Sequence, residues 1–128
     1  MNYLLRQTKG LKGISAMQTY HNKLVRDKIP EIIEAQGEAP ICRVLTNPEY
    51  LDALNQKLQE EVSEYLQDNG VEELCDILEV IYAIAAAKGY TVQDLTKTRS
   101  AKNEKNGAFN RKIFLERVIS PAKELSDL

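Results

Sequence analysis

The sequence predicts an all-α protein: a helical bundle built around an antiparallel hairpin of two acidic helices, with at most short extended segments. Apolar residues recur at helical spacing over residues 48–67 and again over 71–88. The turn-forming residues Asp68, Asn69 and Gly70 separate these stretches, and so short a link makes two helices antiparallel neighbours. The chain has 128 residues, enough for one domain. Because its two long and two shorter helices form only a thin bundle, we expect oligomerisation to complete it by doubling the helix layer.

A short helix is predicted before the hairpin. Asp27 is its expected N-cap, Pro30 lies in the first turn, where a missing N–H costs little, and Gly37 ends it. Residues 41–45 (ICRVL) are expected to be extended. The chain would therefore reach the long helices through an extended connection.

The first long helix is predicted from Pro48 to Gln67, with Asn47 as its cap and Pro48 as its first residue. One apolar stripe runs along it, formed by Leu51, Leu54, Leu58, Val62 and Tyr65. The second long helix is predicted over 71–88, with Gly89 beyond its end. Its apolar residues cover about half of its circumference at 100° per residue, so this half of the helix should be buried, whereas Glu72 and Glu79 point away from it.

A fourth helix is expected to end near Asn106, because Thr91 and Asp94 form a capping-box pattern at its start and Gly107 breaks the helical pattern. Residues 112–119 (KIFLERVI) mix apolar and charged side chains and are compatible with an extended segment. Together with the helices before it, this segment completes the expected series of elements.

The chain is expected to have three parts. Residues 1–16 contain basic residues but no continuous apolar run, and Met17 is an alternative start, so 1–16 is interpreted as a leader or tag-like extension. Residues 17–119 form the domain, and 120–128 are a polar tail.

Composition excludes several kinds of protein. A single histidine, His21, rules out a multi-histidine zinc site, and two cysteines without a CxxC pattern rule out a zinc ribbon or a disulfide scaffold. No apolar run approaches the roughly 20 residues needed to cross a bilayer. We therefore expect a reduced, cytoplasmic protein that has no membrane partner.

The net charge of −2 conceals a strong separation of charge along the chain. Residues 57–80 contain eight acidic residues and a single base, whereas 97–117 contain seven basic residues and two acids. Segment 23–28 is basic as well. An acidic hairpin is thus flanked by basic chain, so the near-zero total is a poor guide to the binding partners of the molecule.

Four acidic residues are placed where the two long helices should bury surface. Glu61 and Glu64 border the apolar stripe of the first helix, and Glu73 and Asp76 project among apolar residues of the second. Unpaired buried carboxylates cost several kcal/mol each, so a positive charge must lie among them. Lys or Arg is one candidate, but the hairpin offers only Lys57 and the terminal Lys88. Mg²⁺ prefers carboxylate oxygens, and the i,i+3 spacing of each pair places both acids on one side of a helix. We therefore predict a Mg²⁺ site, in which Mn²⁺ can substitute, with these four acids as ligands.

A carboxylate Mg²⁺ site commonly serves phosphate chemistry, here metal-assisted attack of water on a polyphosphate. Basic side chains are then needed for the remaining phosphates. Five are assigned to substrate binding: Lys23, Arg26, Lys102, Lys105 and Arg111. For Arg26 an ion pair with Asp27 or Glu31 is the alternative. The chain has no GxxxxGK[ST] loop, which excludes a P-loop nucleotide hydrolase.

Three ordered segments carry a resemblance to a known family. Residues 60–64 (EEVSE) followed by 73–76 (ELCD) resemble the EExxE…ExxD signature of the MazG-like all-α nucleoside triphosphate pyrophosphohydrolases. Residues 20–33 (YHNKLVRDKIPEII) and 106–115 (NGAFNRKIFL) resemble the opening and closing segments of its phosphoribosyl-ATP pyrophosphohydrolase-like single-domain subgroup. The resemblance covers about residues 20–118, which is most of the chain.

This resemblance implies hydrolysis of the bond between the α and β phosphates of a nucleotide, giving a monophosphate and pyrophosphate. It implies that Glu61, Glu64, Glu73 and Asp76 bind the metal and that Glu60, Glu61 and Glu64 act in catalysis, with Glu60 orienting water. It also implies a homodimer or homotetramer. Phosphoribosyl-ATP enzymes usually carry a Tyr-His pair where this chain has Tyr82-Ala83, so the nucleotide stays open.

Two other functions remain as hypotheses. The amphipathic hairpin also suits a non-catalytic helical interaction or regulatory module, which would show no metal-linked stability. Nucleic-acid binding through 97–117 ranks last, because the acidic hairpin would repel phosphates in the absence of metal. We therefore expect no stable nucleic-acid partner.

Overall fold

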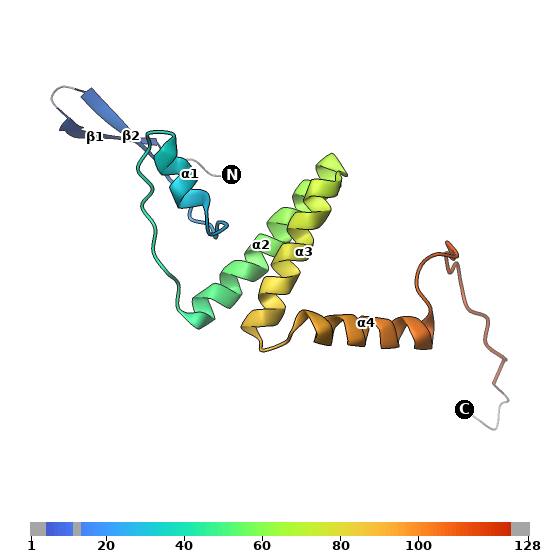
Figure 1. Cartoon of the computed structure of the whole chain (residues 1–128). Helices are drawn as coiled ribbons and strands as arrows, with labels where there is room; N and C mark the ends of the chain where they lie inside the picture. Colours follow the sequence, from blue (N-terminus) through green and yellow to red (C-terminus); the bar gives the residue numbers. More distant parts are fainter. Residues whose placement is uncertain (1–4, 12–13, 124–128) are drawn as a thin grey trace. The chain divides into compact units, whose positions relative to one another are not determined.

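The computed structural model describes residues 5–11 and 14–123, and its regular structure is mostly helical (Figure 1). It divides into two units, residues 1–92 and 93–128. In the described residues the elements follow the order β1, β2, α1, α2, α3, α4. The all-α prediction is confirmed for the main body of the protein.

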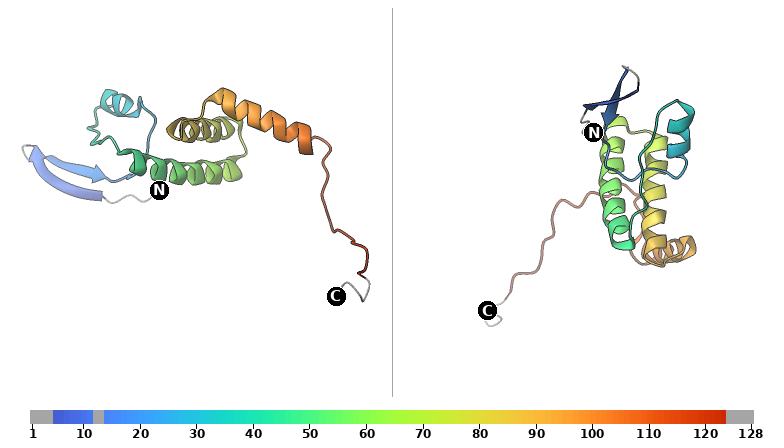
Figure 2. Two further views of the ribbon diagram at one scale, coloured as in Figure 1. Left: turned by 90° about the horizontal axis from the view of Figure 1, so that it is seen from below. Right: turned by 90° about the vertical axis from the view of Figure 1, so that its left-hand side faces the viewer.

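The predicted helix hairpin is present. Helix α2 spans Asn47–Asp68 and helix α3 spans Val71–Ala87, and the two lie side by side in Figures 1 and 2. Asn69 ends α2 in the left-handed region with φ 54°, and its N–H donates to the carbonyl of Tyr65 at 2.7 Å. Asparagine tolerates this conformation, so the reversal of the chain is encoded locally.

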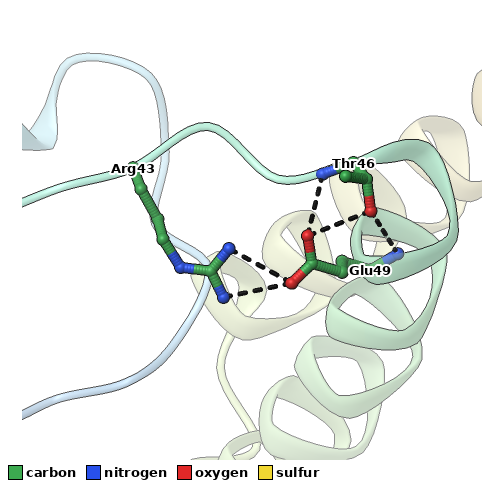
Figure 3. A network of polar contacts seen from close by, with 3 residues as sticks. All are labelled: Arg43, Thr46 and Glu49. Atoms are coloured by element: carbon green, nitrogen blue, oxygen red, sulfur yellow. Dashed lines mark hydrogen bonds and ion pairs between the residues drawn. The ribbon is translucent and has the colours of Figure 1, made fainter.

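Helix α2 begins one residue earlier than predicted. Its N-cap is Thr46, not Asn47: the Thr46 hydroxyl accepts from the Glu49 N–H, and the Glu49 carboxylate accepts from the Thr46 N–H at 3.1 Å (Figure 3). The Arg43 guanidinium donates to the same carboxylate at 3.1 Å. This reciprocal capping box satisfies two backbone donors that would otherwise lack partners, and it holds the extended connection against the start of α2.

Helix α1 spans Ile29–Ala35, with Pro30 in its first turn as predicted. The prediction of Asp27 as its cap is wrong, because Lys28 occupies the N-cap position and no side chain caps the helix. Gly37 follows the helix with φ 82°, a conformation that suits glycine. The short helix is thus set mainly by its proline and its terminal glycine.

The buried core of the hairpin is small. Within the described chain the buried apolar residues are Leu54, Val80 and Ala85, and Leu54 is only 2% exposed. Large apolar side chains elsewhere on the hairpin are exposed, namely Val62, Leu66, Val71, Leu74, Leu78 and Ile81. Two helices alone therefore leave several large apolar side chains partly in contact with water.

The N-terminal region contains a β-hairpin that the sequence did not predict. Strand β1, Leu5–Leu11, pairs antiparallel with β2, Ile14–Thr19, and β2 passes through Met17. The structure does not describe residues 1–4 and 12–13 of the expected extension. Residues 41–45, expected to be extended, form no strand.

Helix α4 spans Val92–Asn106, which confirms the predicted end of that helix, and all of it but its first residue belongs to the second unit. Gly107 comes next with φ 83°, and the described residues beyond it form neither helix nor strand, including the expected extended segment 112–119. Residues 124–128 of the expected tail lie outside the described chain. Among the helices of the described residues, none has the length and apolar character needed to cross a membrane.

Candidate functional site

The predicted acidic residues come from facing helices of the hairpin. Glu60, Glu61 and Glu64 lie on α2, and Glu73 and Asp76 lie on α3. Glu61 is buried, with 6% of its surface exposed, whereas Glu73 and Asp76 are half-buried and Glu64 is exposed. The most buried acid is therefore on α2, although the sequence pattern indicated the deepest positions on α3.

Glu61 is an unusual residue for a helix interior. Its Oε1 lies 3.3 Å from the Lys57 ammonium, one turn earlier on α2. Its Oε2 is buried and has no hydrogen-bond partner. A buried polar atom left without a partner costs about 1–3 kcal/mol, and more when it is charged. This oxygen is therefore the atom of the hairpin that most needs a cation or a donor.

Two lysines approach Glu60. The Lys57 ammonium lies 3.4 Å from Glu60 Oε1, and the Lys23 ammonium lies 3.5 Å from the same oxygen. The Lys23 contact brings the segment before α1 onto the acidic face of α2. Lys23, predicted to bind phosphate, is thus next to the acidic motif.

Arg26 forms an ion pair with Asp76. Its Nη2 donates to Asp76 Oδ1 at 2.7 Å, a contact between residues 50 positions apart. The alternative partners that the sequence offered, Asp27 and Glu31, are not the ones it uses. A second basic residue of the opening segment therefore lies at the acidic motif, this time on α3.

Negative charge stays in excess around Glu64. Although Glu64 is largely exposed, loss of solvation around its carboxyl group, then the charge of Glu61 and a side-chain hydrogen bond with Glu61, raise the pKa of Glu64 above its ordinary value. On α3, the Glu73 carboxylate lies against Gly70, where an added Cβ would collide with it. The remaining predicted ligand thus lies at the hairpin turn.

The acids are not drawn together into a ready metal cage. Among the described side chains, no three carboxylate, histidine or cysteine groups are placed so that they hold a metal ion as they stand. Lys57, Lys23 and Arg26 lie on three of the carboxylates instead. In chemical type the donors fit Mg²⁺, which takes carboxylate oxygens and water, and the unpartnered oxygen of Glu61 is a donor of that kind.

A cleft of about 480 Å³ lies beside the acidic face, between residues 21–24 and helix α2. From α2 it is lined by Ala53, Gln56, Lys57, Glu60, Ser63, Glu64 and Gln67. Its volume falls within the range of small-molecule sites. The sequence interpretation missed the uncharged polar residues of this cleft, Gln56, Ser63 and Gln67. Together with the other lining residues of α2 they recur at three- and four-residue spacing, which marks one helix face.

The other predicted phosphate ligands lie in the second unit. Lys102 and Lys105 are exposed on α4, and Arg111 is exposed beyond it. Of the five predicted phosphate ligands, Lys23 and Arg26 belong to the first unit, where each contacts one of the predicted acids.

About a third of the chain is similar to a known bacterial protein. Over 42 residues the chain is 55% identical to an uncharacterized protein of Mycolicibacterium smegmatis (strain ATCC 700084 / mc(2)155). The match covers 33% of this chain and 43% of that protein, so the chain spans less than half the length of this relative. No family model matches the chain, and no solved structure matches it.

Proposed function

We propose that the protein is a Mg²⁺-dependent nucleotide pyrophosphohydrolase, which cleaves the α–β phosphate bond to give a monophosphate and pyrophosphate. The observation that carries this proposal is the buried Glu61 carboxylate, whose Oε2 lacks a partner within a hairpin rich in acids. The resemblance of residues 60–64 and 73–76 to the MazG-like signature supports the same activity.

Each acidic residue has a role in this proposal. Glu61, Glu64, Glu73 and Asp76 hold the metal, which when bound would polarise phosphate oxygens and lower the pKa of a coordinated water. The carboxylates must change rotamer to converge on it, which exposed and half-buried side chains on a helix surface are free to do. Glu60 orients the attacking water from the face of α2 that borders the cleft.

The cleft beside α2 is the proposed place for the nucleotide. Asn22, Gln56 and Gln67 offer both donors and acceptors there, as recognition of a base or ribose requires. Lys23 supplies positive charge at the cleft edge nearest Glu60. The assignment of Lys102, Lys105 and Arg111 of the second unit to phosphate binding stays a prediction from the sequence.

The activity is tested by incubating the full chain with a panel of nucleoside triphosphates and measuring monophosphate and pyrophosphate. We expect turnover that requires Mg²⁺ or Mn²⁺ and stops with chelator. Glu61→Gln should abolish it, whereas Glu79→Gln, an exposed acid on α3, should leave it unchanged. Turnover that persists in Glu61→Gln or in chelator would contradict the proposal.

The exposed apolar residues favour a second copy of the chain as partner. Leu74, Leu78 and Ile81 follow one another at i, i+4 and i+7 and so share one face of α3, and all are exposed. A hairpin with three buried apolar residues leaves this face to be covered. We propose a homodimer or homotetramer, which light scattering across a concentration series would measure; a monomer at all concentrations would refute it.

The same apolar face also suits a non-catalytic interaction module, the alternative function. Under that alternative the acids are only a solvated surface. Mg²⁺ would then neither raise the melting temperature nor support nucleotide turnover, and this double absence is the result that would favour it over hydrolysis.

A further inference from the structure

The segment before α1 is attached to the acidic hairpin by two ion pairs. Lys23 reaches Glu60 on α2, and Arg26 reaches Asp76 on α3. Both acids belong to the motif that carries the proposed function. Basic residues from outside the hairpin therefore lie on two carboxylates of the motif, and one of these, Asp76, is a proposed metal ligand.

The Arg26–Asp76 pair is the more easily exchanged. The Arg26 side chain is 58% exposed and the Asp76 side chain 37% exposed, although their contact is short at 2.7 Å. Ion pairs this accessible to water contribute only about 0–1 kcal/mol to stability. The pair is thus specific in geometry but weak enough to give way to a competing charge.

We propose that Arg26 is the internal counter-ion of Asp76, that it leaves this carboxylate when a divalent cation binds, and that it then donates to a phosphate of the bound nucleotide. This inference rests on the proposed function. A guanidinium and a divalent cation at one small carboxylate repel each other, so binding of the cation at Asp76 weakens the hold on Arg26. The guanidinium fork matches phosphate oxygens, which gives Arg26 a new partner when substrate is present.

Arg26 is suited to this exchange by its place in the chain. It follows the cleft-lining residues 21–24, so a released Arg26 stays within a few residues of the proposed nucleotide site. Lys57 differs, because it pairs with Glu60 and Glu61 on its own helix and its side chain is only 16% exposed. Lys57 therefore stays with α2, whereas Arg26 belongs to a different segment and can change partner.

The proposal makes two opposite predictions for Arg26→Gln. Removing the competing cation should tighten Mg²⁺ binding about two- to fivefold, the range that an exposed ion pair covers. Removing the phosphate donor should weaken pyrophosphate binding in the presence of saturating Mg²⁺, by about tenfold or more for a charge-assisted pair. A merely structural role for Arg26 would weaken both.

The experiment is calorimetric titration of the full chain with Mg²⁺ and then, in saturating Mg²⁺, with inorganic pyrophosphate. Arg43→Gln is the matched control, because Arg43 is also an exposed arginine paired with a glutamate of α2, at the capping box rather than at the acidic motif. Arg26→Lys, which keeps the charge, should retain a Mg²⁺ affinity close to that of the wild type. Circular dichroism of each variant establishes that the helices are intact.

Tighter Mg²⁺ binding together with weaker pyrophosphate binding in Arg26→Gln, and neither change in Arg43→Gln, supports the exchange. Unchanged or weaker Mg²⁺ binding in Arg26→Gln overturns it, as does unchanged pyrophosphate binding. The wild type separates this inference from the proposed function. If the wild type binds no Mg²⁺, the proposed function fails and the exchange fails with it. If the wild type binds Mg²⁺ and pyrophosphate and Arg26→Gln binds both equally well, only the exchange is refuted.

Discussion

Replacing Glu61 by glutamine should make the metal-free protein more stable and the metal-loaded protein less stable. Glu61 is 6% exposed, and one of its carboxylate oxygens has no partner. Glutamine keeps the size of the side chain and the acceptor that faces Lys57, but it removes the buried negative charge. It also removes a charge that acts to raise the pKa of Glu64.

The gain without metal can be worked from the unpartnered oxygen. A buried polar atom without a partner costs about 1–3 kcal/mol, and because the amide still places a polar group at the same buried position only part of this is recovered. We expect about 1 kcal/mol, or a rise in melting temperature of roughly 4–8 °C for a domain of this size. With Mg²⁺ at about 100 times its dissociation constant, the wild type should gain about 2.7 kcal/mol that the variant lacks.

Thermal unfolding in chelator and across a Mg²⁺ series measures both effects, and the two stability curves should cross. Glu79→Gln, the exposed acid on α3, should follow the wild type throughout. Two results would refute this reasoning: Glu61→Gln is less stable than the wild type in chelator, or Mg²⁺ stabilises Glu61→Gln as much as it stabilises the wild type. In either case Glu61 has a structural role and does not bind a cation.

Three further predictions concern the fold. Leu54→Ala, at the most buried apolar position, should lower the free energy of unfolding by about 3 kcal/mol, measured as a lower urea midpoint with little change in slope. Hydrogen bonds from the Thr46 N–H and hydroxyl, and then from Arg43, lower the pKa of Glu49. The ionised Glu49 therefore stabilises the fold fully above the ordinary pKa of a glutamate, and this stabilisation is lost as the pH falls through the lowered pKa. Acid unfolding of Glu49→Gln should lack this pH-dependent loss of stability. Leu78→Glu places a charge on the exposed apolar face of α3 and should convert the proposed oligomer to monomer in light scattering, with the helix content by circular dichroism unchanged.

The helix hairpin was predictable because its determinants are local. Helical spacing and the turn at Asp68–Gly70 are both properties of neighbouring residues, and α2 and α3 end within one residue of the expected bounds. The error at the start of α2 has a local cause as well. Asn47-Pro48 is a good start pattern, but Thr46 and Glu49 satisfy each other reciprocally, and two such hydrogen bonds outweigh one asparagine cap.

The contacts of the candidate site were less predictable. Periodicity assigns an acid to a helix face, but it does not give the partner that reaches that face from elsewhere in the chain. Arg26 and Asp76 are 50 residues apart, and nothing in the spacing of either distinguishes this pair from Arg26 with Asp27. The β-hairpin of β1 and β2 was missed for a related reason, because its cross-strand pairing follows no strong apolar alternation in 5–19.

The charge balance of the site argues for a divalent cation in particular. Five carboxylates, those of Glu60, Glu61, Glu64, Glu73 and Asp76, belong to the motif, and three cationic side chains, Lys23, Arg26 and Lys57, pair with members of this set. Two negative charges are left over, and one divalent cation neutralises that excess. Release of Arg26 when the cation binds gives the site one more negative charge to hold the metal and frees the guanidinium for a phosphate, so metal and substrate binding should each strengthen the other.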